Sequence, residues 1–172
     1  LSSCQGLFNS GLEAGAAYGA EVALEWNQGV TNWQVSPGGS TLEELCCRAL
    51  CRLFELGPDA EATVLYSGTY ANQQALYMAL HHWAGKRGFD LSASGLAGFD
   101  DPSRLTVLVS EDAHFSVRQA VRFLGLGDDA MMEVKTDENR RMDVDALREV
   151  ARECRGDREV FCVVATAGTT PT

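Results

Sequence analysis

The sequence predicts an α/β protein with a mostly parallel sheet and flanking helices. Short apolar runs near residues 63–66, 105–109, 131–135 and 160–165 alternate with segments of helical periodicity. The connections between these runs are long enough to cross over a sheet, as parallel strands require. Ligands of such sheets bind beyond the carboxyl ends of the strands, so the polar residues that follow each run are candidates for a functional site.

Length and composition indicate one medium-sized soluble domain. The chain has 172 residues, 45% of them hydrophobic, and its mean hydropathy is -0.12. With 14 Lys and Arg against 24 Asp and Glu, the formal charge of -10 argues against nucleic acid as a partner. No signal-peptide pattern and no apolar run of membrane length is visible, so we expect a cytoplasmic protein without a membrane partner.

The N-terminal part is expected to be helical. Residues 12–26 place apolar side chains on one helical face, whereas residues 27–39, rich in Asn, Gly, Ser and Pro, are expected to form a loop. Ser40-Thr41-Leu42-Glu43 matches a capping box and predicts a helix that ends before Gly57-Pro58. One face of that helix is apolar and is expected to be buried; its members are Leu42, Leu45, Cys46, Ala49, Leu50, Leu53 and Phe54.

The remaining segments complete the alternation of strands and helices. Residues 85–104, rich in Gly, Ser and Asp, are expected to form an exposed excursion. A helix is predicted after His114, and Gly125 and Gly127 are expected to end it. Asp143 is expected to cap the last helix, which precedes the last strand.

The cysteines and histidines do not suggest a metal site. The six cysteines are Cys4, Cys46, Cys47, Cys51, Cys154 and Cys162. None forms a C-x-x-C pair and no histidine lies at ligand spacing from them, so no zinc site is expected. Cys46 and Cys162 occupy apolar positions, which favours buried, reduced thiols. His81 and His82 are adjacent on a helix and point to different faces, which favours a surface role over a metal site.

Residues 63–72 are the strongest candidate for anion binding. They predict an apolar strand, a tight Ser67-Gly68-Thr69 turn and a helix that continues to about Trp83. This layout directs the free backbone N–H groups of a helix N-terminus and two hydroxyls towards one point. Gly68 would let a ligand approach the backbone closely. The alternative is an ordinary capped turn, because Ser and Thr are common N-cap residues.

Three predicted strand ends carry polar residues of the kind that bind ligands. They are Ser67-Gly68-Thr69, His114 and Thr169-Thr170. Because the carboxyl ends of parallel strands lie at one edge of a sheet, we expect these residues to converge. The alternative for His114 is a core or capping histidine, and for Thr170 a hydroxyl that ties down a turn.

Several segments, in this order, resemble the group II pyridoxal-phosphate decarboxylases of amino acids. That family includes glutamate, aromatic L-amino-acid, histidine and 2,4-diaminobutyrate decarboxylases. Ser36-Pro37 with Ser40-Thr41-Leu42-Glu43 is similar to the family pattern S-P-x-x-T-x-L-E. Residues 66–72 are similar to the family pattern S-G-G-T-E-A-N, and residues 110–116 to S-D-x-A-H-x-S. Residues 136–138 with 141–143, and residues 164–170, continue the match. The resemblance covers about residues 28–172.

The resemblance implies pyridoxal 5'-phosphate as the cofactor and an L-amino acid as the substrate. Gly68 and Thr69 would hold the cofactor phosphate through backbone N–H and hydroxyl groups. His114 would be the catalytic residue, stacking on the pyridine ring and acting near the substrate carboxylate. Thr170, with Thr169 as the alternative, would hydrogen-bond near the ring hydroxyl or the carboxylate.

The resemblance also implies an architecture, the first half of a fold-type I (aspartate-aminotransferase-like) large domain. Residues 1–40 would be an N-terminal helix and loop segment, and residues 41–172 part of the cofactor-binding domain. In the family the Schiff-base lysine and the aspartate facing the pyridine nitrogen follow the Thr-Thr segment. Lys86 and Lys135 lack the surroundings of that lysine. We therefore expect an N-terminal portion of a homodimeric enzyme, inactive by itself, whose first strand pairs with a late antiparallel strand outside this sequence.

The sequence departs from the family at two places and leaves two other functions open. Tyr70 stands where the family usually has Glu, and Ser67 where it often has Gly. Another fold-type I lyase or a desulfurase would share the phosphate loop but not the Ser36-Pro37 segment. A non-catalytic remnant could act as a scaffold or binding module. The amino acid that serves as substrate is not identified by the sequence.

Overall fold

The computed structural model of the chain describes residues 11–168. Contacts divide the chain into two compact units, Leu1–Val64 and Leu65–Thr172, which are described separately. The domain boundary predicted at residue 40 stays a prediction. The contact boundary falls later in the chain because the Glu43 carboxylate of the first unit accepts hydrogen bonds from the Val64 N–H (3.0 Å) and the Thr63 hydroxyl (3.3 Å).

The first unit contains the two predicted helices, α1 (Ala14–Trp26) and α2 (Pro37–Leu53). Helix α1 begins two residues later than expected because the Glu13 carboxylate caps it, accepting from the N–H groups of Gly15 (2.8 Å) and Ala16 (3.2 Å). It ends at Asn27, which adopts a left-handed conformation with a φ of 43°.

Helix α2 begins earlier than the capping box predicted. Ser36 is its N-cap, and its hydroxyl accepts from the Gly39 N–H at 3.2 Å. Pro37 occupies the first turn, where its fixed φ suits a helix and its missing N–H costs nothing. Ser40 therefore lies inside the helix, and the expected loop is correspondingly shorter.

The expectation that the apolar face of α2 is buried is wrong for the described structure. Its leucines and Phe54 are exposed, and Cys46 is exposed as well. The buried thiols are those of Cys47 and Cys51, on the other side of the helix. Periodicity identified the apolar face correctly but could not show whether a partner surface covers it.

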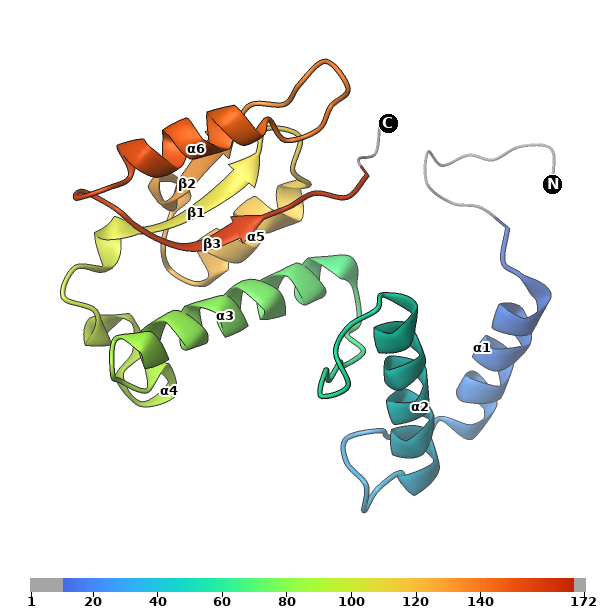
Figure 1. The fold of residues 1–172 in the computed structure, drawn as a ribbon. Coiled ribbons are helices and arrows are strands. Elements are labelled where there is room, and N and C mark those ends of the chain that lie inside the picture. The colour runs from blue at the N-terminus through green and yellow to red at the C-terminus, as the bar shows by residue number, and fades with distance from the viewer. Residues whose placement is uncertain (1–10, 169–172) are drawn as a thin grey trace. The chain divides into compact units, whose positions relative to one another are not determined.

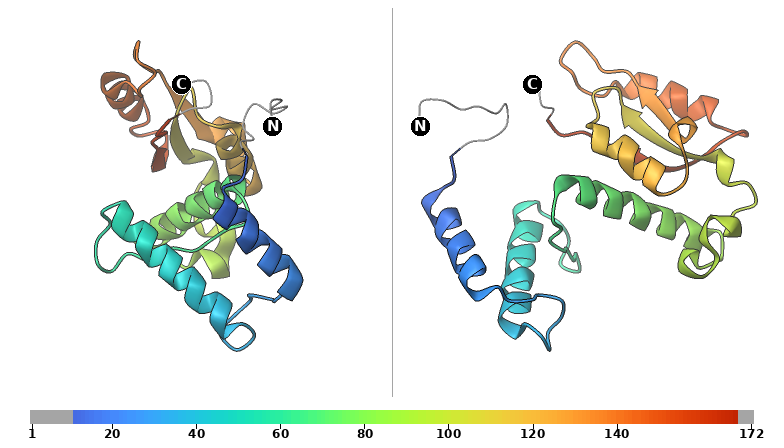
Figure 2. Two further views of the ribbon diagram at one scale, coloured as in Figure 1. Left: turned by 90° about the vertical axis from the view of Figure 1, so that its right-hand side faces the viewer. Right: turned by 180° about the vertical axis from the view of Figure 1, so that it is seen from behind.

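The second unit has a three-stranded parallel sheet with strand order β2-β1-β3. The strands are β1 (Leu105–Ser110), β2 (Met131–Val134) and β3 (Glu159–Val164), and all three were predicted. Helices α3 (Gly68–Lys86) and α5 (Phe115–Phe123) cover one face, and α6 (Val144–Glu153) covers the other (Figures 1 and 2). This is the helix-flanked parallel sheet that the alternation of segments predicted.

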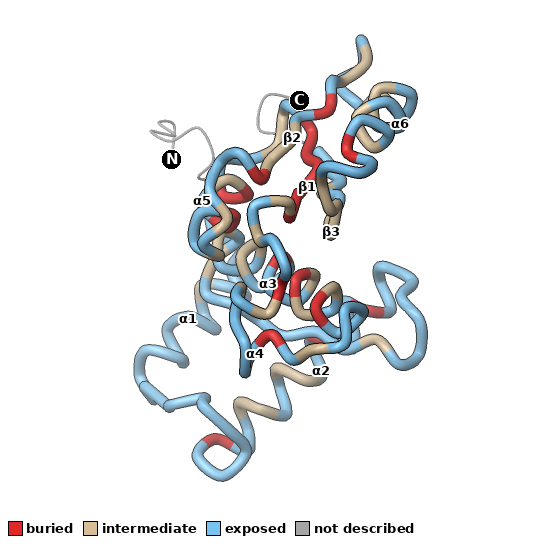
Figure 3. The backbone as a smooth tube through the Cα atoms, turned by 90° about the vertical axis from the view of Figure 1, so that its left-hand side faces the viewer, coloured by how far each residue is buried: buried red, intermediate tan, exposed pale blue. Residues whose placement is uncertain are grey.

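Strand β1 is the centre of the core, because every one of its six residues is buried (Figure 3). Val107 and Val109 face α3 and α5, where they pack with Leu76 and Val121. Leu108 points the opposite way and packs with Val134 and Cys154 on the α6 side. The continuous apolar sequence of this strand follows from burial on both faces of the sheet.

The first predicted strand, residues 63–66, does not form. These residues are not paired with any strand of the described chain, and Tyr66 is 95% exposed. An extended segment becomes a strand only when a neighbouring strand pairs with its backbone N–H and C=O groups. The described sheet has the strand order β2-β1-β3 and does not include residues 63–66.

Residues 85–104 are more ordered and more buried than expected. They contain the short helix α4 (Leu91–Ser94) and the 3₁₀ turns η1 (Gly95–Gly98) and η2 (Pro102–Arg104). Leu91 and Phe99 are buried beside Leu80 of α3, and the Phe89 and Phe99 rings meet edge to face at 4.8 Å between centroids. The segment therefore closes the end of the core instead of projecting from it.

Two further features anchor the second unit. Asp143 caps α6 as predicted, its carboxylate accepting from the N–H groups of Asp145 and Ala146. The Glu159 carboxylate at the start of β3 accepts from Arg87 at 2.7 Å and from the Trp83 indole at 3.3 Å. This second contact joins the C-terminal end of α3 to the edge of the sheet.

We expect Glu159→Gln to lower the free energy of unfolding by about 0.5–1 kcal/mol, because it removes the charge that faces Arg87 at a partly solvent-screened site. Urea unfolding followed by circular dichroism would measure the change. Glu153→Gln is the matched control, since Glu153 is exposed near the end of α6. Equal losses in both variants would contradict a structural role for the Glu159 contact.

Candidate functional site

Helices α3 and α5 begin close together, at the edge of the sheet where β1 ends (Figure 1). The Asn72 side-chain amide, in the second turn of α3, donates to the Ser116 hydroxyl in the first turn of α5 at 2.7 Å. Both helices therefore present the positive ends of their dipoles at this edge. The structure brings the Gly68–Thr69 turn and His114 to the same end of the second unit, as the sequence predicted.

The start of α3 retains free hydrogen-bond donors although it is capped. The Ser67 hydroxyl accepts from the Tyr70 N–H at 3.4 Å, and the Ser67 carbonyl accepts from the Ala71 N–H at 2.9 Å. The N–H groups of Gly68 and Thr69 precede these and have no acceptor within the helix. Gly68 is exposed, and a Cβ atom built there would meet no atom within 4 Å. The turn is thus an ordinary N-cap that also leaves an open position for an anion.

His114 is the N-cap of α5, so the alternative of a capping histidine is confirmed. Its Nδ1 accepts from the Ser116 N–H at 3.2 Å and lies 2.7 Å from the Ser116 hydroxyl. The residue is nevertheless exposed, and its ring lies 4.1 Å from that of Phe115 between centroids. Capping uses only Nδ1, which leaves Nε2 and a ring face available to a ligand.

The third candidate, Thr170, lies outside the described residues, as does Thr169. The chain is described up to Gly168, which has a φ of 80°. Because β3 pairs with β1, with Val164 opposite Val109, the residues after β3 leave the sheet at the same edge as those after β1. A role for Thr170 stays a prediction.

The loop between β1 and His114 is fixed by side chains of the segment after β2. The Glu111 carboxylate accepts from the Thr136 N–H (2.8 Å) and hydroxyl (2.7 Å). Asp112 pairs with the Arg140 guanidinium at 3.1 Å. These contacts, made by Thr136 and Arg140, hold the loop that leads to His114.

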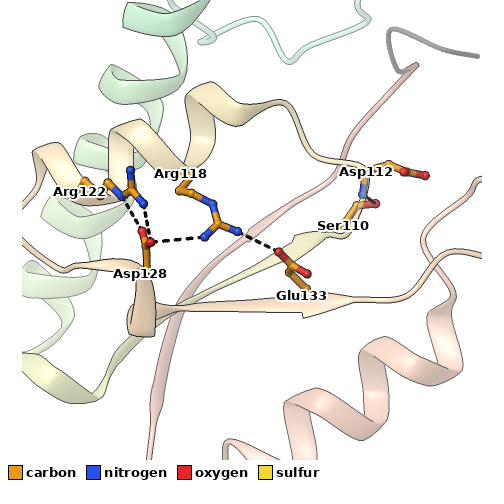
Figure 4. A network of polar contacts seen from close by, with 6 residues as sticks. All are labelled: Ser110, Asp112, Arg118, Arg122, Asp128 and Glu133. Atoms are coloured by element: carbon orange, nitrogen blue, oxygen red, sulfur yellow. Dashed lines mark hydrogen bonds and ion pairs between the residues drawn. The ribbon is translucent and has the colours of Figure 1, made fainter.

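Two arginines of α5 are paired with carboxylates (Figure 4). Arg122 binds Asp128 with two hydrogen bonds, and Arg118 bridges Asp128 and Glu133 at 3.4 and 3.0 Å. The bond to Arg122 holds the pKa of Asp128 below its ordinary value. The network joins α5 to β2 and to η3 (Asp128–Ala130), so its role is structural.

Two kinds of feature, metal-ligand clusters and membrane-spanning helices, were not found in the part of the chain that the structure describes. Among those residues no group of three His, Cys, Asp or Glu side chains could hold a metal ion. No helix among them has the length and apolarity needed to cross a membrane. Burial raises the pKa of the Cys162 thiol, which favours its protonated, unreactive form.

Sequence reasoning missed the roles of Asn72 and Ser116. Both belong to the segments that carry the family resemblance, but neither was assigned to the site. They lie 44 positions apart in the chain, and only the packing of α3 against α5 brings them together. No local pattern could have shown this contact.

The comparisons with known proteins agree with the geometry. The family model described as the pyridoxal-dependent decarboxylase conserved domain matches residues 2–172. The chain is 36% identical to an L-2,4-diaminobutyrate decarboxylase of Rhizobium meliloti (strain 1021) over 156 residues, covering 90% of this chain and 29% of that protein. It is 31% identical to the enzyme of the same name from Acinetobacter baumannii, covering 88% of this chain and 31% of that protein.

Solved structures show the same relationship. One is the glutamate decarboxylase domain of a diaminobutyrate-pyruvate transaminase and L-2,4-diaminobutyrate decarboxylase from Vibrio parahaemolyticus, with a TM-score of 0.88 and 27% identity over 95% of this chain and 35% of that chain. Mouse CSAD gives a TM-score of 0.82 and 28% identity over 95% of this chain and 33% of that chain. The sequence thus spans about a third of the length of these relatives.

The parallel, helix-flanked sheet is that of the fold-type I pyridoxal-phosphate enzymes. The chain belongs to the pyridoxal-dependent decarboxylase family, within its group II amino-acid decarboxylases, and its cofactor is pyridoxal 5'-phosphate.

The Glu111 contact predicts a pH dependence of stability. Hydrogen bonds from the Thr136 N–H and hydroxyl hold the pKa of Glu111 below its ordinary value of 4.5. A carboxyl group whose pKa is lower in the folded than in the unfolded state stabilises the fold at pH values above its ordinary pKa. This contribution to stability is lost as the pH falls through the folded-state pKa. We therefore expect Glu111→Gln to be less stable than the wild type at pH 7, and the difference to be smaller at pH 3, which lies below the ordinary pKa of the carboxyl.

Urea unfolding at both pH values would measure the difference. Glu138→Gln is the control, because Glu138 is an exposed carboxylate in the same segment. A constant difference between wild type and Glu111→Gln across this range would contradict the contact.

Proposed function

We propose that the complete protein containing this sequence decarboxylates an L-amino acid, as a pyridoxal-phosphate-dependent carboxy-lyase. The observation that carries the proposal is the convergence of the open start of α3 with the exposed ring of His114 at the carboxyl edge of the sheet. Family membership sets the class of chemistry, and this geometry supports the binding of a phosphorylated aromatic cofactor.

The residues present fit the cofactor. A phosphate dianion requires several donors, and the Gly68 and Thr69 N–H groups, the Thr69 hydroxyl and the helix dipole provide them. The open space at Gly68 permits close approach to the backbone. When bound, pyridoxal phosphate supplies an electron sink for the bond that loses carbon dioxide.

His114 is proposed as the catalytic residue of this chain. Its ring is exposed beside the start of α5, so one face can stack on the aromatic ring of the cofactor. Nε2 is left to hydrogen-bond the substrate near its carboxylate, because Nδ1 caps the helix. Thr170 is proposed as a further cofactor-binding residue, on the family resemblance alone.

The lysine that binds the cofactor covalently is proposed to lie outside these 172 residues. Lys86 is at the far end of α3, about 27 Å from Gly68 for 18 residues at a helical rise of about 1.5 Å each. Lys135 follows the outer strand β2 and lacks the family's surroundings. We therefore expect the 172-residue chain to bind pyridoxal phosphate weakly and to release no carbon dioxide from any amino acid.

The substrate, assembly and location belong to the same proposal. Two similar relatives are named L-2,4-diaminobutyrate decarboxylases, which makes 2,4-diaminobutyrate the first substrate to test. A homodimer and a cytoplasmic location are proposed from the family resemblance. The exposed apolar residues of α2 are compatible with further protein contacts.

Product analysis separates this proposal from its alternatives. The complete protein, incubated with a panel of L-amino acids, is expected to release carbon dioxide and the corresponding amine. Sulfide from cysteine would instead identify a desulfurase, and an aldehyde from a phosphorylated amino alcohol another fold-type I lyase. Absence of any turnover from the complete, cofactor-loaded protein would favour the scaffold.

Gly68→Ala tests the phosphate site. The added methyl group enters open space, so we expect unchanged or slightly higher thermal stability, in keeping with the helix preference for Ala over Gly of up to about 1 kcal/mol. The same methyl group would obstruct the approach of a phosphate, so the affinity for pyridoxal phosphate should fall about tenfold or more, which corresponds to roughly 1.4 kcal/mol.

The control is Gly85→Ala, which adds a methyl group to open space at the other end of α3. It should leave cofactor affinity unchanged. Equal affinities of the two variants, measured by calorimetry, would remove Gly68 from the site.

A further inference from the structure

We infer that Asn72 is a positioning residue, which acts through the Ser116 hydroxyl and together with the Ser116 backbone N–H to hold the tautomer of His114. The hydrogen-bond relay stands on the geometry of this chain, and only its purpose rests on the proposed function. Its three members come from two elements: Asn72 from α3, and His114 and Ser116 from the start of α5.

The first contact on His114 Nδ1 comes from the backbone. The backbone N–H of Ser116 lies 3.2 Å from His114 Nδ1 and can act only as a donor. This contact favours a lone pair on Nδ1, and the direction of the Ser116 hydroxyl decides whether the second contact of Nδ1 supports or opposes it. In the neutral ring the proton is then on Nε2.

The second step fixes the direction of the serine hydroxyl. Ser116 is fully buried, and its Oγ lies 2.7 Å from both His114 Nδ1 and Asn72 Nδ2. The Asn72 amide donates to Oγ, so the single hydroxyl proton is directed to Nδ1. The relay thus runs in one direction, from Asn72 through Ser116 to His114.

The consequence is that His114 offers an N–H donor, at Nε2, to whatever binds beside it. Under the proposed function this donor would face the anionic carboxylate of the substrate. An aspartate at position 72 would act oppositely, because its carboxylate would accept the Ser116 proton and leave Oγ free to accept from a protonated Nδ1. The neutral amide is therefore the suitable group at this position.

The tautomer can be read directly from the ¹⁵N chemical shifts of the imidazole in the 172-residue chain labelled at histidine. At a pH where the ring is neutral, we expect an unprotonated, pyridine-type Nδ1 and a protonated, pyrrole-type Nε2 for His114. A pyrrole-type Nδ1 in the wild-type chain would overturn the inference without any variant.

The isosteric variant Asn72→Asp should move the Nδ1 shift towards the pyrrole type at the same pH. Gln74→Glu is the matched control, because it adds the same charge at an exposed position of α3, and it should leave both ring shifts unchanged. Unchanged shifts in Asn72→Asp, or equal changes in both variants, would overturn the inference.

A double mutant separates the relay from a direct effect of charge. In a Ser116→Ala background the hydroxyl is missing, so Asn72→Asp should no longer change the Nδ1 shift. A change as large as in the wild-type background would show that residue 72 acts without Ser116 and would overturn the relay.

The outcome is independent of turnover. The expected shifts together with an inactive complete protein would refute only the proposed function. Unaltered shifts in Asn72→Asp beside full decarboxylase activity would refute only the relay.

Discussion

Burial of β1 on both faces is the constraint on which the second unit depends. All six residues of the strand are buried, with valines directed to α3 and α5 and Leu108 directed to α6. A strand covered on both sides needs helical crossovers, which fix the parallel order β2-β1-β3. The chain must then leave β1 at one edge of the sheet, and the residues that leave there are those leading to His114.

We propose that this edge binds the cofactor phosphate without a cluster of free basic side chains, in a chain whose net charge is -10. Arg118, Arg122 and Arg140 are engaged by Asp128, Glu133 and Asp112. The positive potential comes instead from the starts of α3 and α5, held side by side by the Asn72 to Ser116 hydrogen bond. Backbone donors of this kind suit a compact phosphate better than a long polyanion.

Features that depend on local sequence could be predicted, whereas features that depend on partners could not. The strand β1 and the Asp143 cap depend on residues that are neighbours in the chain, and both predictions are confirmed. The strand at 63–66 and the burial of the α2 leucines require a second surface, and both predictions were wrong for the described residues. For the candidate site, motifs could propose Gly68 and His114, whose roles stay predictions, but the buried contact of Ser116 arises only from tertiary packing.

The central claim is that the starts of α3 and α5 form one cofactor site. Amide and imidazole chemical-shift mapping of the ¹⁵N-labelled chain, titrated separately with pyridoxal phosphate and with pyridoxal, tests it most directly. The account predicts that pyridoxal phosphate shifts the Gly68 and Thr69 amides together with the His114 ring, at one common affinity, and that pyridoxal leaves the two amides unmoved. Shifts confined to the surroundings of Lys86 or Lys135, or different affinities at the two helix starts, would contradict it.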